Sequence, residues 1–330
     1  MLDYYTLTAN ENEIEILAEL RSYLLPNMDK TLTAQFASLI DNKPLINKLD
    51  RFLARDDNAF VVDLIAELSS ILGVANGHMI ASSIILSDKL FLEPIFDNIR
   101  LATYPTNFAN TILDLDEKHN RVTGSGTVRT IGIQAHTMLA LVRGTQSGKI
   151  GVVAVPMKDI EIDLATPKAI ICNFNVDAKP QYFRNLNRSG VEKAIKEVYV
   201  TNFSLALGSL REARLATESH CKNHILFGKP LLQHQSTQSR LAQGVVHEEL
   251  LRAITIRQHS EFTALQKYQV VMIHKIRGII QQSFTDMAHL HGAESVLERT
   301  SIPFMELKST ILGLIDESIT GIFKPIKNYT

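Results

Sequence analysis

The chain has 330 residues, of which 45% are apolar and 21% are charged, and its formal net charge is −1. This length and composition are typical of a folded protein built from several packed layers, and they exclude a mainly disordered chain. The near-neutral charge gives no electrostatic reason to expect binding to nucleic acid or to an anionic membrane surface.

Cysteine usage and hydropathy suggest the compartment. The two cysteines, Cys172 and Cys221, lie far apart and lack metal-ligand spacing, so we expect free thiols in a reducing environment. Neither a membrane span nor a signal peptide is predicted, because we find no uninterrupted apolar run of about 18 residues and no basic segment followed by an apolar one at the N-terminus. A cytoplasmic location is the resulting expectation.

The N-terminal part, residues 12–92, is predicted to be helical. Its apolar residues recur at spacings of three and four, as in the segment AFVVDLIAELSSILG, and Gly73 is a plausible helix stop. Asn76 and Gly77 follow and are predicted to form a turn.

The pattern changes twice after this region. Residues 100–180 contain short runs rich in Thr, Val and Ile, separated by turn residues, which indicates a small antiparallel β domain. Helical periodicity then returns in four long segments with short connections, as in an antiparallel four-helix bundle: 191–222, 230–257, 261–290 and 304–322. The predicted fold is α+β, with an N-terminal helical domain, a middle β domain and a C-terminal bundle, divided as 1–98, 99–188 and 189–330.

One stretch, FGKPLLQHQSTQSRLA from Phe227 to Ala242, differs from the plain periodicity around it. A Phe-Gly pair at the entrance of a helix lets backbone approach a flat or phosphorylated ligand, because glycine has no Cβ and the helix N-terminus favours anions. The alternative is a helix–helix corner in which Gly228 and Pro230 only shape the turn.

This stretch resembles the C-terminal domain of the acyl-CoA dehydrogenase family, in which Phe-Gly, Gln and Leu-Ala follow one another in the same register. The matching residues are Phe227, Gly228, Lys229, Pro230, Gln235, Leu241 and Ala242. Weaker similarities are found in ATYP, VTGSGTVRT, ALGSLREA, MAHLHGAES and IDESI, so that the resemblance covers about residues 95–320. It implies an acyl-CoA dehydrogenase-like fold.

The resemblance also implies FAD as cofactor. Thr103 and Thr130, expected on β segments, would donate hydroxyl hydrogen bonds to the edge of the isoalloxazine ring, or else are ordinary β-branched strand residues. The other cofactor-binding positions that it implies are His224, Phe227, Gln235, His289, Gly292 and Ser318.

The implied reaction is α,β-dehydrogenation of an acyl thioester carried by CoA or by an acyl carrier protein. In the family a glutamate removes the α proton, and it must lie in a dry pocket for this. Ungapped counting places Asp316 at that position, and a small shift would make Glu317 the base. The alternative is that both acids are solvated charges at a helix end.

Departures from the family pattern weaken the prediction of tight FAD binding. His224 stands where the family has arginine, which removes a permanent cation suited to pyrophosphate. His289, Ala293 and Ser295 replace residues of a glycine-rich loop. A second hypothesis is therefore a catalytically degenerate subunit or scaffold that completes the flavin site of a longer acyl-CoA dehydrogenase partner.

The resemblance also implies an oligomeric assembly, whereas the question of a metal site rests on residue spacing. A homodimer, a homotetramer or a heteromer with a related dehydrogenase is expected, with an electron-acceptor flavoprotein as a further partner. His220 and His224 have the i, i+4 spacing of metal ligands, but no third ligand is evident, and we interpret them as surface or interface histidines. No metal site is predicted.

Overall fold

The structure is a computed structural model, and it describes residues 11–24, 42, 44–45, 48–49, 58–83, 101–106, 108–132, 134–163, 171–260, 267–296 and 304–323. The chain divides into two compact units. The first contains residues 1–77, 204–261 and 279–308, and the second contains 78–203, 262–278 and 309–330. The predicted three-domain boundaries remain a prediction.

The N-terminal helices are α1 (Glu11–Leu24) and α4 (Asn58–Ala81). Gly73 interrupts α4 with non-helical angles, φ 77° and ψ 161°, where the sequence predicted a stop. The predicted turn at Asn76 and Gly77 is wrong, because both residues belong to the helical part after Gly73. The chain reverses at Gly73 instead, and a Cβ on Gly77 would lie only 2.7 Å from the Ser69 Cα.

Hydropathy singles out α4. Of the described helices, its segment Ala59–Ala81 is long and apolar enough to cross a membrane by those two criteria, but 67% of the window is buried within the protein. Such burial is also typical of the core helix of a soluble protein.

The β domain is an eight-stranded sheet in the second unit. Its strands are β1 (Ala102–Thr103), β2 (Ile112–Asp116), β3 (Arg121–Arg129), β4 (Thr137–Gly144), β5 (Ile150–Pro156), β6 (Ile160–Asp163), β7 (Ile171–Ala178) and β8 (Tyr182–Asn185). Two short 3-10 helices interrupt the strands, η4 (Thr130–Gly132) and η5 (Met157–Asp159).

The strand order is β6-β7-β3-β2-β4-β5-β8, and β1 pairs with β4. Most neighbours are antiparallel, as predicted, but β1 and β2 both run parallel to β4, so the sheet is mixed. Burial alternates strictly along β7, which has one solvated face, whereas every residue of β5 is buried. The Val and Ile runs of the sequence therefore mark strands covered on both faces.

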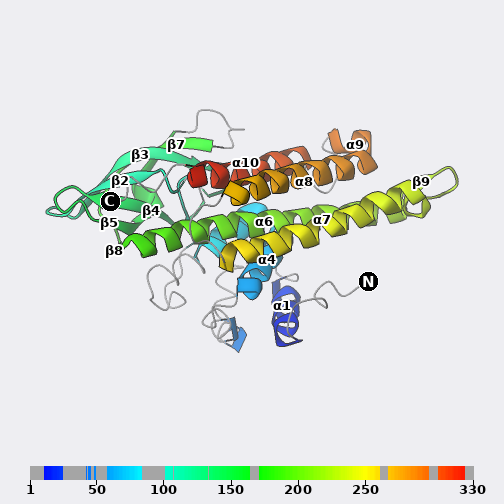
Figure 1. The fold of residues 1–330 in the computed structure, drawn as a ribbon, viewed down its shortest axis with the longest axis horizontal. Helices are drawn as coiled ribbons and strands as arrows, with labels where there is room; N and C mark the ends of the chain where they lie inside the picture. The colour runs from blue at the N-terminus through cyan, green and yellow to red at the C-terminus, as the bar shows by residue number, and fades with distance from the viewer. Residues whose placement is uncertain are drawn as a thin grey trace. The chain divides into compact units, whose positions relative to one another are not determined.

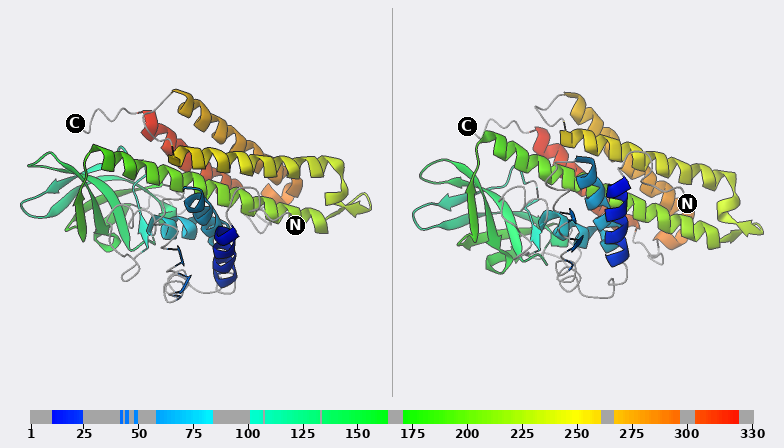
Figure 2. Two further views of the ribbon diagram at one scale, coloured as in Figure 1. Left: turned by 60° about the horizontal axis from the view of Figure 1, so that its bottom comes forward. Right: turned by 90° about the horizontal axis from the view of Figure 1, so that it is seen from below.

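The four long helices predicted for the C-terminal region are present as α6 (Arg188–Asn223), α7 (Gln235–Ser260), α8 (Lys267–His291) and α10 (Phe304–Phe323). Between them lie the strands β9 (Ile225–Leu226) and β10 (Lys229–Pro230), the 3-10 helix η6 (Leu231–Gln233) and the short helix α9 (Ala293–Val296). The second half of α6 and α7 run side by side and are joined at one end by the β9–β10 hairpin (Figure 1 and Figure 2).

Close packing and buried ion pairs hold the helices of the first unit together. A Cβ on Gly208 of α6 would lie 2.1 Å from the carbonyl oxygen of Ala66 on α4, so the two helices touch through backbone. Arg252 of α7 binds Asp63 of α4 with Nε 2.7 Å from Oδ1, and both side chains are buried. A buried carboxylate of this kind needs such a partner to offset its desolvation.

Each unit contains one of the two cysteines. Cys172 lies on β7 of the second unit and Cys221 near the end of α6 in the first, and both are buried free thiols. Burial raises the pKa of both thiols, that of Cys221 to about 11.

Candidate functional site

The Phe-Gly stretch forms a tight hairpin. Leu226 pairs with Lys229, so Phe227 and Gly228 are the only two residues in the turn. Both have positive φ, 52° and 77°, which is the requirement of a type I′ turn. The sequence predicted a helix entrance here, but the turn precedes η6, and α7 begins only at Gln235.

Phe227 stands out on this hairpin because its side chain is 89% exposed. The ring of His234 lies edge-on to it at 6.4 Å between centroids, and His234 Nε2 lies 3.1 Å from the Leu226 carbonyl oxygen. A Cβ on Gly228 would meet open space. The tip thus presents an exposed aromatic face beside backbone that a ligand can approach closely.

His224 is part of a row of three stacked imidazoles. Its ring stacks on His220 at 5.0 Å between centroids, and His220 stacks on His291 of α8 at 4.2 Å. The row runs from exposed His224 to buried His291, whose Nε2 lies 3.3 Å from the Thr217 hydroxyl. The structure therefore connects His224 through His220 to the end of α8, an arrangement that the sequence did not predict.

The other predicted dinucleotide positions in the first unit lie at helix ends. Gln235 is the first residue of α7 and is exposed. His289 is exposed in the last turn of α8, and its carbonyl oxygen accepts a hydrogen bond from the Gly292 amide at 3.1 Å. Gly292 has φ 61°, and a Cβ there would meet open space. Of these three residues, Gly292 leaves room for a ligand at the backbone, and the other two are exposed.

Thr103 is placed differently. It lies on β1, as predicted, but its side chain is completely buried. Its hydroxyl oxygen lies 3.2 Å from Nε2 of His78 at the end of α4. His78 is itself buried, and its ring meets Tyr104 edge-on at 4.8 Å. The Thr103 hydroxyl is therefore engaged inside the protein.

Thr130 is half-buried and belongs to η4, so its expected position on a strand is wrong by one residue, because β3 ends at Arg129. Arg129 is buried, and a Cβ on Gly313 of α10 would lie 3.1 Å from its Nη1. The end of β3 thus touches α10 one turn before Asp316.

Asp316 makes an ion pair with Arg277 of α8. Arg277 Nε lies 2.7 Å from Oδ1 and Nη2 lies 3.4 Å from Oδ2, so the contact is two-pronged. The bond to Asp316 raises the pKa of the Arg277 guanidinium. Glu317 and Ser318 follow on α10, but their side chains lie outside the described part of the chain.

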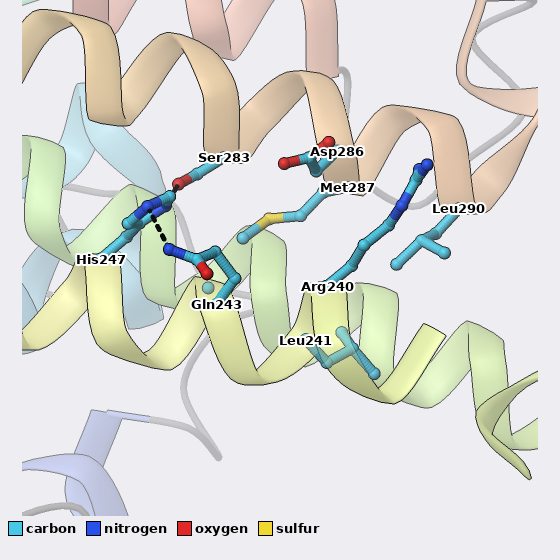
Figure 3. Close-up of a pocket in the computed structure, with 9 residues that line it drawn as sticks. Arg240, Leu241, Gln243, His247, Ser283, Asp286, Met287 and Leu290 are labelled. Carbon is cyan, nitrogen blue, oxygen red and sulfur yellow. Dashed lines mark hydrogen bonds between the residues drawn. The ribbon is translucent and has the colours of Figure 1, made fainter. Parts of the chain in front are cut away.

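A pocket between α7 and α8 is lined by residues that, apart from Leu241, the sequence analysis did not single out (Figure 3). His247 is one of the lining residues, with Nδ1 2.6 Å from the Ser283 hydroxyl and Nε2 3.0 Å from the Gln243 amide nitrogen. Burial lowers the pKa of His247, which favours the neutral ring. The pocket contains about 260 Å³, too little for a dinucleotide.

Within the described ranges, no group of three or more His, Cys, Asp or Glu side chains is arranged to hold a metal ion. The stacked row of His220, His224 and His291 presents ring faces to one another, whereas metal ligation uses the ring nitrogens.

Comparison with solved structures relates these features to one fold. The chain matches an acyl-CoA dehydrogenase from Geobacillus kaustophilus with a TM-score of 0.64 and 14% identity, over 95% of this chain and 98% of that one. The chain has the acyl-CoA dehydrogenase fold. A glutaryl-CoA dehydrogenase from Mycobacterium smegmatis in complex with FADH2 matches with a TM-score of 0.57 and 13% identity, over 95% and 94%.

The ChsE4-ChsE5 complex from Mycobacterium tuberculosis matches similarly, with a TM-score of 0.61 and 13% identity, over 96% and 94%. No family model and no curated protein matches the sequence. The acyl-CoA dehydrogenase fold inferred from the Phe227–Ala242 stretch is thus confirmed by structure at an identity too low for sequence comparison to detect.

The predicted site residues differ in how well they suit an FAD molecule. Phe227, Gly228 and Gly292 suit it, because the phenyl ring is exposed and both glycines face open space. Thr103 does not, because its hydroxyl already contacts His78. No local sequence signal points to His78 or Arg277, because their contacts are with residues distant along the chain.

Proposed function

We propose that this chain is a subunit of a flavin-dependent acyl-thioester dehydrogenase. The observation that carries the proposal is the exposed Phe227–Gly228 turn, which leads into α7 within an acyl-CoA dehydrogenase fold. An aromatic residue with positive φ and an exposed side chain is costly for a chain that uses the turn only as a connection. Contact between a flat ligand and the exposed Phe227 ring would offset this cost.

The first unit would hold the dinucleotide part of FAD. Phe227 would pack against a flat ring, Gly228 and Gly292 would allow close approach of the backbone, and Gln235 would donate or accept a hydrogen bond. His224 would face the diphosphate with at most two donors, so it would hold the anion less firmly than arginine does. FAD, when bound, supplies a hydride acceptor for the β carbon of the substrate.

The residues proposed to accept the substrate's α proton lie on α10. In the version in which this chain is itself the catalyst, the carboxylate of Asp316 or Glu317 accepts the α proton of an acyl thioester on CoA or on an acyl carrier protein. Asp316 has a stem one methylene shorter than glutamate, so the substrate or the backbone would have to lie closer. Arg277 must release Asp316 in this version, because its guanidinium engages both carboxylate oxygens, one of which would have to reach the α proton.

The second candidate is a catalytically degenerate subunit that completes the flavin site of a longer dehydrogenase. The Arg277–Asp316 pair favours this second candidate, since the carboxylate at the expected base position is already held in an ion pair. The contact of Thr103 with His78 favours it as well. In either version we propose a cytoplasmic homodimer, homotetramer or heteromer with a related dehydrogenase, and an electron-acceptor flavoprotein as a further partner.

The test begins with the purified full chain. Flavin content per chain is measured from its visible absorbance, and a series of acyl-CoA and acyl-carrier-protein thioesters is tested for flavin reduction. If this chain is the catalyst, Asp316→Asn or Glu317→Gln lowers the rate by about 100-fold or more with flavin still bound. If the chain completes a partner's site, reduction occurs only with a co-purified longer dehydrogenase, and both substitutions leave the rate unchanged.

The diphosphate contact has a test of its own. His224→Arg adds a permanent cation with a planar fork, so flavin retention after dialysis should rise. His234→Arg is the matched control, because His234 also lies beside the hairpin but bonds the Leu226 carbonyl. Retention that stays the same or falls in His224→Arg would show that this position faces no diphosphate.

A further inference from the structure

The buried surroundings of Thr103 are occupied by the protein's own side chains. His78 Nε2 lies 3.2 Å from the Thr103 hydroxyl oxygen, and the two side chains are 1% and 0% exposed. On another side Gly132 leaves no space, because a Cβ there would lie 2.0 Å from the same oxygen. An incoming ring could reach this hydroxyl only after the imidazole has moved.

The imidazole is fixed from several directions. Tyr104 packs edge-on against it, and the Tyr104 hydroxyl donates a hydrogen bond to Asn202 Oδ1 of α6 at 2.7 Å. The other ring nitrogen, Nδ1, is buried without a hydrogen-bond partner among the described residues, so the contact with Thr103 is what orients the ring. Losing that contact would leave both ring nitrogens buried and unsatisfied.

The charge state of the ring is constant at the pH of a cell. Burial and, as a smaller cause, the nearby Arg129 cation together lower the pKa of His78 to about 3. The imidazole is therefore neutral near pH 7 and does not leave the pocket by becoming protonated. The contact with Thr103 is a permanent feature of the fold and not a pH-dependent one.

The hairpin in the first unit, unlike the surroundings of Thr103, is open to solvent. Phe227 is 89% exposed, its neighbours Ile225 and Leu226 are also exposed, and Gly228 faces open space. One half of the predicted flavin site, on β1, is thus closed by the chain itself, whereas the other half, at the hairpin, is open.

We propose that His78 blocks the ring-binding strand of this chain, so that an FAD molecule whose diphosphate part lies at its hairpin has its isoalloxazine ring held by the β domain of a longer flavoprotein subunit. The partner is a dehydrogenase of the same fold whose residue at the Thr103 position is free of an internal contact. This inference rests on the proposed function and specifies its partner. His78 is a blocking residue and takes no part in the chemistry.

The experiment measures FAD retained by the full chain alone after equilibration and dialysis. The wild-type chain should retain less than about one tenth of an equivalent, and His78→Ala should raise retention by about tenfold or more, because it opens the space beside Thr103. His78→Gln is the matched control, since its amide can still donate to Thr103 and should keep the strand closed. Circular dichroism verifies that each variant is folded, and His78→Ser replaces His78→Ala if the latter is not.

Two results would overturn the inference. If the wild-type chain alone retains one FAD per chain and Thr103→Val lowers that retention, then Thr103 binds the ring directly and the proposed function stands without a partner. If His78→Ala and His78→Ser are folded but retain no more FAD than the wild type, His78 is not what closes the strand. Failure of the proposed function is separate, since it would appear as no flavin reduction by any acyl thioester even with a co-purified longer dehydrogenase.

Discussion

Arg277 and Asp316 form a two-pronged ion pair between α8 and α10, with Nε 2.7 Å from Oδ1. The Arg277 side chain is 38% exposed and that of Asp316 is 46% exposed, so water reaches both. A general base must reach the proton that it removes, and Arg277 engages both oxygens of this carboxylate. The pair therefore decides whether the acid at the expected position can act as a base.

The stability contributed by this pair should be small. Asp316→Asn and Arg277→Gln should each lower the free energy of unfolding by less than about 1 kcal/mol, because exposed ion pairs are screened by water. Urea denaturation of both single variants and the double variant gives the coupling energy. A coupling above about 3 kcal/mol would mean that the pair is dry, as in a closed active site.

Gly208 should be among the positions least tolerant of a side chain. Gly208→Ala places a Cβ 2.1 Å from the Ala66 carbonyl oxygen, so α4 and α6 must separate, at a cost of about 3 kcal/mol. Gly278→Ala on α8 is the matched control, because a Cβ there meets open space and alanine favours the helix by about 1 kcal/mol. Thermal denaturation should show opposite shifts. Equal shifts would contradict the backbone contact at Gly208.

Phe227 should be dispensable for folding but needed for cofactor binding. Phe227→Asn should raise the free energy of unfolding by about 1 kcal/mol, because asparagine tolerates positive φ better than phenylalanine. The same change should lower FAD retention by the assembled enzyme. Gly228→Ala tests the turn itself and should cost about 1–2 kcal/mol. Unchanged flavin retention in Phe227→Asn would leave the exposed ring without a cofactor role.

His78 should make the protein less stable in mild acid. Its folded pKa of about 3 lies below the unfolded value of 6.5, so below pH 6.5 the unfolded chain binds a proton that the folded chain does not. Stability is therefore lost as the pH falls from 6.5 toward 3, by about 2 kcal/mol between about pH 7.5 and pH 5. His78→Leu should remove this part of the pH dependence. The measurement is urea denaturation of both proteins at several pH values. If His78 were exposed, the free energy of unfolding would change with pH by the same amount in the wild type and in His78→Leu.

The fold could be predicted because its signals are local. Helical periodicity located α6, α7, α8 and α10 to within about six residues at each end, and Phe227–Gly228 pointed to the family architecture. The parallel pairing of β1 and β2 with β4 was missed, because alternation along one strand does not specify the direction of its neighbour.

The candidate site was harder to predict, because its state depends on contacts distant along the chain. Thr103 was placed on its strand correctly, but nothing in ATYP indicates that His78, which is 25 residues earlier, occupies its hydroxyl. Asp316 likewise gives no local sign of Arg277, which is 39 residues away. A motif match identifies which residue stands at a site position. The contacts of that residue's side chain depend on how elements distant along the chain pack together.

The two buried thiols can report how often each unit opens. An exposed thiolate attacks alkylating reagents, so neither Cys172 nor Cys221 should react while its own unit is closed. Because each unit holds one cysteine, the rate of labelling at each site, read by mass spectrometry, reports how often that unit opens. Ligand binding to the hairpin side alone should slow labelling of Cys221 and leave that of Cys172 unchanged.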